Sequence, residues 1–194
     1  MIRCALGFRV KSGWAMAVLL SGPAASPTVV YRRRIELADP AVPASTQPFH
    51  AGLDLTKSAA AKKVGGLVKC VEQFSRGSIK ALLEEYRLKG YRVVAAGIVA
   101  GSLIDPETIK NDHIRAHAEE GRLFRTVISE TLKGARLKCH VVGEKELLAI
   151  ATKELGMAEA EIKTELTAMG KALGGPWRAE EKAAALVAWM NLNQ

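Results

Sequence analysis

The chain has 194 residues and a formal net charge of +8 at pH 7. This length suits a single domain, residues 1–194, that buries a core without help from disulfides or metals. Hydrophobic residues make up 48% and charged residues 25%, which excludes a disordered chain, and no apolar stretch approaches the roughly 18 residues of a membrane span. The positive charge favours contact with phosphates or another acidic surface.

The first residues and the cysteines both indicate the cytoplasm. MIRCALGFRVKSGW passes from a short apolar run directly to Arg9 and Lys11, so it lacks the apolar region of a signal peptide. Cys4, Cys70 and Cys139 are far apart and odd in number, which suits neither a disulfide framework nor a zinc knuckle. We therefore expect a cytoplasmic protein with reduced thiols and no membrane contact.

Three short strands are expected at the start of the chain. Residues 2–8 and 14–20 are apolar runs separated by a turn with Gly13, as in a β-hairpin. Residues 28–37 alternate between apolar and basic side chains, which indicates a third strand. Residues 38–56 contain three prolines and predict a long loop, and loops of that length often carry function.

Helices and strands then alternate. Apolar positions at helical spacing predict one long helix or two over residues 57–89, and the uniformly apolar run 93–101 predicts a parallel strand covered on both faces. The remaining expected elements are a helix from Asp112 to Gly134, a strand at 137–142, and helices at 144–155, 157–173 and 177–192. This order predicts a mixed sheet of three antiparallel strands followed by two parallel ones.

Three short motifs accompany this order of elements. They are Ala5–Arg9 (ALGFR) with Ser12–Ala15 (SGWA), Glu119–Arg122 (EEGR), and Glu181–Ala188 (EKAAALVA). In these motifs and in element order the chain resembles RuvC-type Holliday-junction resolvases of the ribonuclease H-like superfamily. The resemblance implies an α/β, ribonuclease H-like fold with a five-stranded mixed sheet flanked by helices.

The resemblance also implies a cluster of catalytic acids, most of which this sequence lacks. Enzymes of this fold cleave phosphodiesters with two metal ions held by carboxylates. The acid of the first strand falls on Arg9, which cannot bind a cation, and that of the fourth strand falls near Gly97 or Ile98. The acids of the last helix fall on Glu181 and Ala184, so Glu181 is the member that remains. A cap in the first turn of that helix is the alternative role for Glu181.

The histidines are further candidates. His113 and His117 lie four residues apart on one helix face beside Glu120, a spacing that permits metal binding. A packed histidine is the alternative for His117, because it falls within the expected apolar stripe of the helix. That stripe consists of Ile114, His117, Gly121, Phe124 and Ile128. His50 lies in the long loop and could reach a pocket at the sheet edge, whereas a lone loop histidine is more often simply exposed.

Basic side chains are the candidates for contact with nucleic acid. The set consists of Arg9, Arg32, Arg34, Arg122 and Arg125. Arg32 and Arg34 belong to a strand expected at the sheet edge, where charge also prevents aggregation between edges. Other cations, Lys62 and Lys63 among them, could track a phosphate backbone if they share a face.

Two kinds of function remain open. The first is a non-catalytic or altered RuvC-like domain, a pseudo-nuclease, that binds nucleic acid or a protein partner through a basic surface. The alternative is a metal-dependent nuclease or phosphate-directed hydrolase whose rebuilt site uses Glu181 with His50 or His113. Only this alternative calls for Mg²⁺ or Mn²⁺. A homodimeric scaffold leaves no mark in the sequence.

Overall fold

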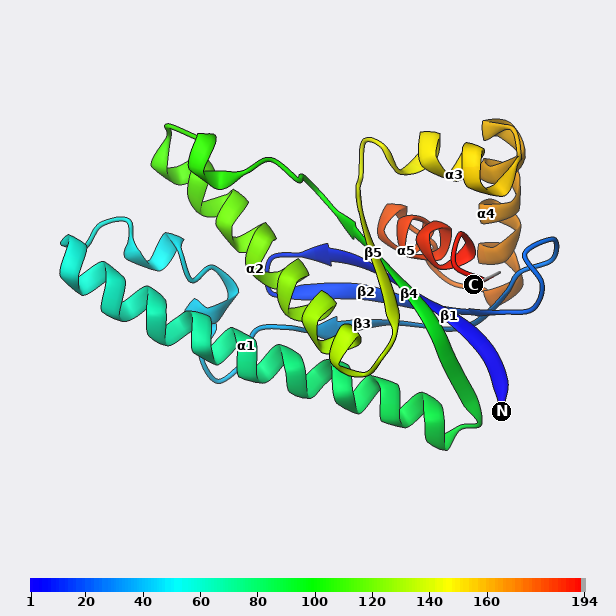
Figure 1. Cartoon of the computed structure of the whole chain (residues 1–194), viewed down its shortest axis with the longest axis horizontal. Helices are drawn as coiled ribbons and strands as arrows, with labels where there is room; N and C mark the ends of the chain where they lie inside the picture. Colours follow the sequence, from blue (N-terminus) through cyan, green and yellow to red (C-terminus); the bar gives the residue numbers. More distant parts are fainter. Residues whose placement is uncertain (193–194) are drawn as a thin grey trace.

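The computed structural model of the chain describes residues 1–192 and is built around one mixed β-sheet with helices on both faces (Figure 1). The strands are β1 (Ile2–Lys11), β2 (Trp14–Ser21), β3 (Thr28–Glu36), β4 (Tyr91–Ala100) and β5 (Lys138–Gly143). Their order is β3-β2-β1-β4-β5. The first three strands are antiparallel, and β4 and β5 run parallel to β1. The predicted five-stranded mixed sheet is therefore confirmed, with β3 at one edge.

The helices form a layer on each face of the sheet. They are α1 (Lys57–Leu88), α2 (Asp112–Gly134), α3 (Leu147–Leu155), α4 (Glu159–Leu173) and α5 (Ala179–Trp189), with short 3₁₀ turns η1 (Pro43–Thr46), η2 (His50–Gly52) and η3 (Pro106–Thr108). Helices α1 and α2 cover one face, and α5 covers the other together with α3 and α4 (Figure 1). The predicted elements are all present, with α1 as one continuous helix.

Cys4, Cys70 and Cys139 are free thiols. Within residues 1–192, none of the helices combines the length and the apolar character that crossing a membrane requires.

Helix α2 buries a different side from the one expected. Its C-terminal half packs Phe124 and Ile128 into the core as predicted, but Ile114 and the side chain of His117 are 56% and 51% exposed. Glu120 is fully buried instead. The interpretation of His117 as a packed core histidine was therefore wrong. The first turns of α2 face the η2 segment, so this loop and not the sheet selects the buried side there.

Helix α5 contacts the sheet at two glycines that lie side by side. Gly7 of β1 pairs in register with Gly97 of β4. A Cβ atom at Gly7 would lie 1.9 Å from the carbonyl oxygen of Ala184, and one at Gly97 would lie 2.3 Å from Cγ2 of Val187. The absence of both side chains lets the backbone of α5 lie directly on the centre of the sheet.

We expect Gly7→Ala to lower the free energy of unfolding by about 3 kcal/mol, because the added methyl group meets helix backbone that cannot move aside alone. Gly77→Ala, in the interior of α1, is the matched control. Its new Cβ meets open space, so this change should stabilise the protein by about 0.5–1 kcal/mol. Urea denaturation measures both, and equal effects would contradict the close contact between α5 and β1.

Burial also predicts a loss of stability in alkali. It raises the pKa of the Cys4 thiol to about 11. The neutral thiol contributes its full stabilisation below the unfolded-state pKa of about 8.5. This stabilisation is lost as the pH rises toward the folded-state pKa. Unfolding measured between about pH 8 and 10.5 should therefore lose less stability in Cys4→Ala than in the wild type. Cys70→Ala controls for the removal of a thiol. If the unfolding free energy of Cys4→Ala falls with pH as steeply as that of the wild type, the loss does not come from Cys4.

Candidate functional site

A pocket lies at the carboxyl ends of β1 and β4, where the sequence resemblance places the functional site. Its volume is about 400 Å³. Arg9 and Lys11 line it from β1, Gly101 and Ser102 follow β4, and His117 lines it from α2. The pocket therefore lies between the sheet and the first turns of α2.

Arg9 is buried at this pocket and is 3% exposed. Its Nε and Nη2 atoms donate to the two carboxylate oxygens of Glu144 at 3.1 and 2.5 Å, and Nη1 donates to the carbonyl oxygen of Val10 at 2.6 Å. Glu144 directly follows β5. The Arg9 guanidinium, already paired in two directions, thus occupies the end of β1.

The residues that stand where the resemblance implies catalytic acids do not fit two divalent cations. Arg9 places a permanent positive charge where the first carboxylate should be. Gly97 lies beneath Val187 and Asn191, which leave no room for a longer side chain. Glu181 caps α5 instead, because its Oε2 accepts a hydrogen bond from the backbone N–H of Arg178 at 2.9 Å. We therefore assign no metal-dependent cleavage step to this pocket.

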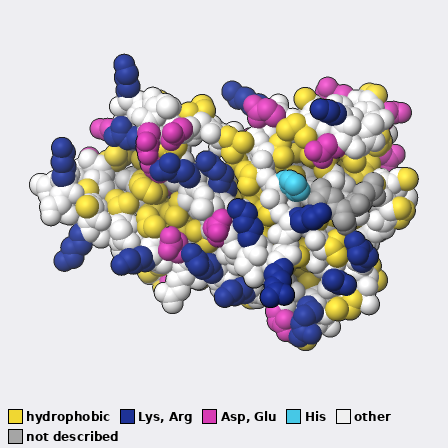
Figure 2. Space-filling model, viewed as in Figure 1, with side chains coloured by type: hydrophobic (Ala, Val, Ile, Leu, Met, Phe, Trp, Pro, Cys, Tyr) yellow, Lys and Arg dark blue, Asp and Glu magenta, His cyan; other side chains and the backbone are white. Residues whose placement is uncertain are grey.

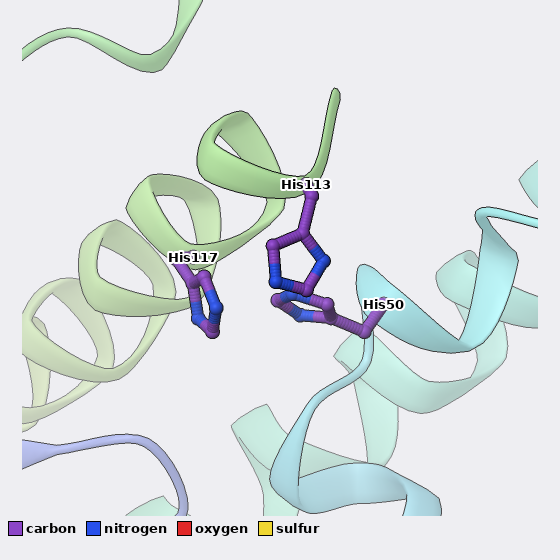
Figure 3. A group of neighbouring side chains, drawn as sticks. All are labelled: His50, His113 and His117. Carbon is purple, nitrogen blue, oxygen red and sulfur yellow. The ribbon is translucent and has the colours of Figure 1, made fainter. Parts of the chain in front are cut away.

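Three histidines meet beside the pocket (Figure 3). His50 comes from η2, and His113 and His117 lie one turn apart on α2. One ring nitrogen of each lies within 4.8 Å of those of the other two. The sequence predicted a pair, His113 and His117. The structure places His50 of the long loop beside them, a residue that the sequence had suggested only for a separate catalytic role.

Glu120 lies buried among these rings. Its Oε1 accepts hydrogen bonds from Nδ1 of His50 at 2.8 Å and from the backbone N–H of His50 at 3.3 Å. Its Oε2 lies 3.8 Å from Nδ1 of His117. Within the described part of the chain, Nε2 of His50 and Oε2 of Glu120 are both buried and lack a hydrogen-bond partner. The cluster is therefore incomplete in its polar contacts.

The arginines predicted to bind nucleic acid lie in separate surroundings. Arg9 is buried, as described above, and Arg32 donates to the carbonyl oxygens of the segment between α4 and α5. The guanidinium of Arg34 lies 4.4 Å from the ring centroid of Trp14 and pairs with Glu36. These contacts explain local packing, and nucleic-acid binding by these three arginines stays a prediction.

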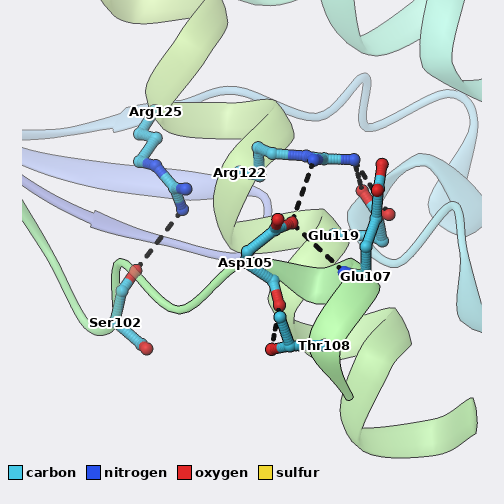
Figure 4. Close-up of polar contacts among 7 residues, drawn as sticks. All are labelled: Ser102, Asp105, Glu107, Thr108, Glu119, Arg122 and Arg125. Carbon is cyan, nitrogen blue, oxygen red and sulfur yellow. Dashed lines mark hydrogen bonds and ion pairs between the residues drawn. The ribbon is translucent and has the colours of Figure 1, made fainter. Parts of the chain in front are cut away.

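Arg122 and Arg125 hold the segment that follows β4 against α2 (Figure 4). Arg122 pairs with Glu119 at 2.7 Å and lies 3.7 Å from Asp105. Arg125 donates to the carbonyl oxygen of Ser102 at 3.4 Å and has no ion-pair partner among residues 1–192. Burial, together with the charge of Arg122, lowers the pKa of Arg125.

Helix α1 carries a basic stripe that the sequence analysis did not assign. It consists of Lys62, Lys69, Arg76 and Lys80. The four are seven, seven and four residues apart, so they lie within about 40° of one another around the helix and span roughly 27 Å along it. All four are exposed, and none forms an ion pair within the described residues. Their spacing was visible in the sequence, and the structure shows that they lie opposite the buried Val71 and Leu82.

The fold shows which class of known structures this chain resembles. The strand order and the two helical layers are those of a RuvC-like, ribonuclease H-like α/β fold. No protein-family model and no curated protein matches the chain. Among solved structures, Thermus thermophilus RuvC is similar with a TM-score of 0.54 and 10% identity over 98% of this chain and 92% of that chain. T. thermophilus RuvC in complex with a Holliday junction substrate has the same TM-score and identity, over 98% and 91%.

The ion pair in the pocket can be tested through stability. Glu144→Ala leaves the buried guanidinium of Arg9 without its carboxylate, and we expect it to cost about 2 kcal/mol of unfolding free energy. Glu154→Ala removes an exposed carboxylate of α3 and should change stability by no more than about 0.5 kcal/mol. Thermal and urea unfolding measure both variants. Similar small losses in the two would show that Arg9 does not depend on Glu144.

Proposed function

We propose that this chain is a RuvC-like module that binds the phosphate backbone of nucleic acid through the basic stripe of α1. The observation that carries the proposal is that four exposed cations share one helix face without acidic partners. Each Lys or Arg that neutralises a phosphate releases bound counterions, which provides affinity without dependence on base sequence. A stripe of this kind suits contact with the backbone and not with the base edges.

The two ends of α1 differ in how their charges are compensated. Near the C-terminal end, Glu84 pairs with Arg87, and Glu85 pairs with Lys89 and with Arg33 of β3. These contacts lower the pKa of both carboxyls. Between residues 57 and 83, Glu72 is the only acid. The N-terminal two thirds of the helix therefore presents an uncompensated positive charge.

The surface beside the stripe leaves room for a ligand. A groove of about 630 Å³ runs along α1. Lys69, Gln73 and the glycines Gly66 and Gly77 line it from the helix, and Asp39 lines it from the loop before the helix. Side chains are missing at both glycines and the space above them is open, so a bound backbone can come close to the helix. Figure 2 shows Lys and Arg side chains spread over the viewed face, interrupted by apolar areas and fewer acidic ones.

The contacts of Glu181 and His50 favour a binding role over the hydrolase that the sequence left open. That hydrolase requires Glu181 to act together with His50 or His113. Glu181 is engaged as the cap of α5, whereas His50 is held by Glu120 on α2. The similarity to a RuvC that was solved with a Holliday junction substrate adds an analogy of fold. We therefore favour binding without family-type cleavage, in the cytoplasm, with a protein partner or a homodimer as further predictions.

Charge-removal variants test this proposal. Fluorescence anisotropy with labelled duplex, branched and single-stranded DNA, titrated at salt concentrations from about 50 to 200 mM, gives the slope of log K against log salt concentration. Replacing all four stripe residues by Gln should reduce that slope by about 3–4 on duplex DNA, close to one for each phosphate contact.

The control variant changes the net charge equally at other places. It replaces Lys138, Lys145, Lys153 and Lys171, which are also exposed, by Gln. We expect this variant to retain most of the wild-type slope. Equal losses in the two variants would attribute binding to net charge alone, and binding by the wild type that does not respond to salt would contradict the proposal.

A further inference from the structure

The cluster of His50, His113 and His117 has the composition of a transition-metal site. Imidazole nitrogen suits Zn²⁺, Cu²⁺, Ni²⁺ and Fe²⁺, whereas Mg²⁺ and Mn²⁺ prefer oxygen. In a tetrahedral Zn²⁺ site with Zn–N distances of about 2.0–2.1 Å, the ligand nitrogens are roughly 3.4 Å apart. The three nitrogens here lie within 4.8 Å of one another, so modest rotation of the side chains closes the set. The spacing of His113 and His117 by one helical turn places both on the same side of α2.

The contact between Glu120 and His50 prepares one ligand atom. Because Oε1 of Glu120 is 2.8 Å from Nδ1 of His50, a proton on Nδ1 is held there and Nε2 is left with its lone pair. That Nε2 atom is buried and has no hydrogen-bond partner among the described residues. Leaving a buried acceptor without a partner is unfavourable, and a bound cation would offset that cost. A carboxylate that receives the second N–H of a ligating histidine is the usual support of such sites.

The charge of Glu120 points in the same direction. The carboxylate is fully buried, and within the part of the chain that the structure describes no Lys or Arg pairs with it. Oε2 has no hydrogen-bond partner among residues 1–192. A buried carboxylate with no Lys or Arg beside it is costly, and a divalent ion bound by the three imidazoles would supply a compensating positive charge.

We propose that His50, His113 and His117 bind one Zn²⁺ ion, with Glu120 as the positioning residue for His50. Three protein ligands leave a fourth position for water, as in zinc sites of the open type. His117 also lines the pocket that contains Arg9, so we expect this fourth position to be reached from the pocket. The ion ties the η2 segment to the start of α2, and the site is independent of the basic stripe on α1.

Metal titration of the full chain tests this site. The protein is freed of metal with a chelator and titrated with ZnCl₂ by calorimetry, and with CoCl₂ by visible absorption, which reports the ligand geometry. We expect one ion per chain. His113→Ala and His117→Ala each remove one imidazole ligand. Both rings are largely exposed, so the fold should survive while the affinity for Zn²⁺ falls at least 100-fold. Glu120→Gln should weaken binding about 10–100-fold.

Two comparisons keep the result interpretable. His140→Ala removes an exposed histidine of β5 and should bind Zn²⁺ as the wild type does. Far-UV circular dichroism in the presence of the chelator shows whether each variant is folded. No Zn²⁺ binding by the wild type, or wild-type affinity in both His113→Ala and His117→Ala, would overturn the proposal. If DNA binding is lost only in the α1 variants while these variants still bind Zn²⁺, the zinc site is independent of the stripe, as proposed.

Discussion

The close contact of α5 with the centre of the sheet is the constraint on which the rest of the structure depends. Gly7 and Gly97 lie next to each other in β1 and β4, and α5 occupies the space that their side chains would need. This contact fixes the two central strands, and their carboxyl ends then form the floor of the Arg9 pocket. The same contact excludes a carboxylate at Gly97, because Val187 and Asn191 already fill that space. Packing of the core and the loss of one expected acid therefore have a single cause.

Much of this fold could be predicted from the sequence because its signals are local. Each strand and helix has its own hydrophobic period, and turns such as the one at Gly13 separate them. The prediction was wrong in the first turns of α2, where periodicity favoured burial of Ile114 and His117. Glu120 is buried there because His50, far away in sequence, donates to it. A local sequence pattern cannot predict a contact with a residue such as His50, which a distant loop brings next to the helix.

The candidate site divides in the same way. The spacing of His113 and His117 was sufficient to suggest a pair, since a helix holds residues four apart on one side. The path of residues 38–56 was needed to bring His50 to them, and a proline-rich loop has no periodicity from which to predict its path. The basic stripe required a different piece of information. Spacing alone places Lys62 and Arg76 on one face, and burial of Val71 and Ile79 on the other side of α1 shows that this face is exposed.

The two proposals together imply a change in the kind of ion that this fold attracts. Carboxylates at the ends of β1 and β4 would hold hard cations such as Mg²⁺. Arg9 repels such cations, and its guanidinium forms an ion pair with Glu144. His117 also lines this pocket, and together with His50 and His113 it offers imidazole nitrogen, which selects softer ions. Affinity for nucleic acid is then supplied by α1 through phosphate contacts that need no metal. Under these two proposals, nucleic-acid binding and metal binding, which a two-metal nuclease joins in one site, occupy separate places in this chain.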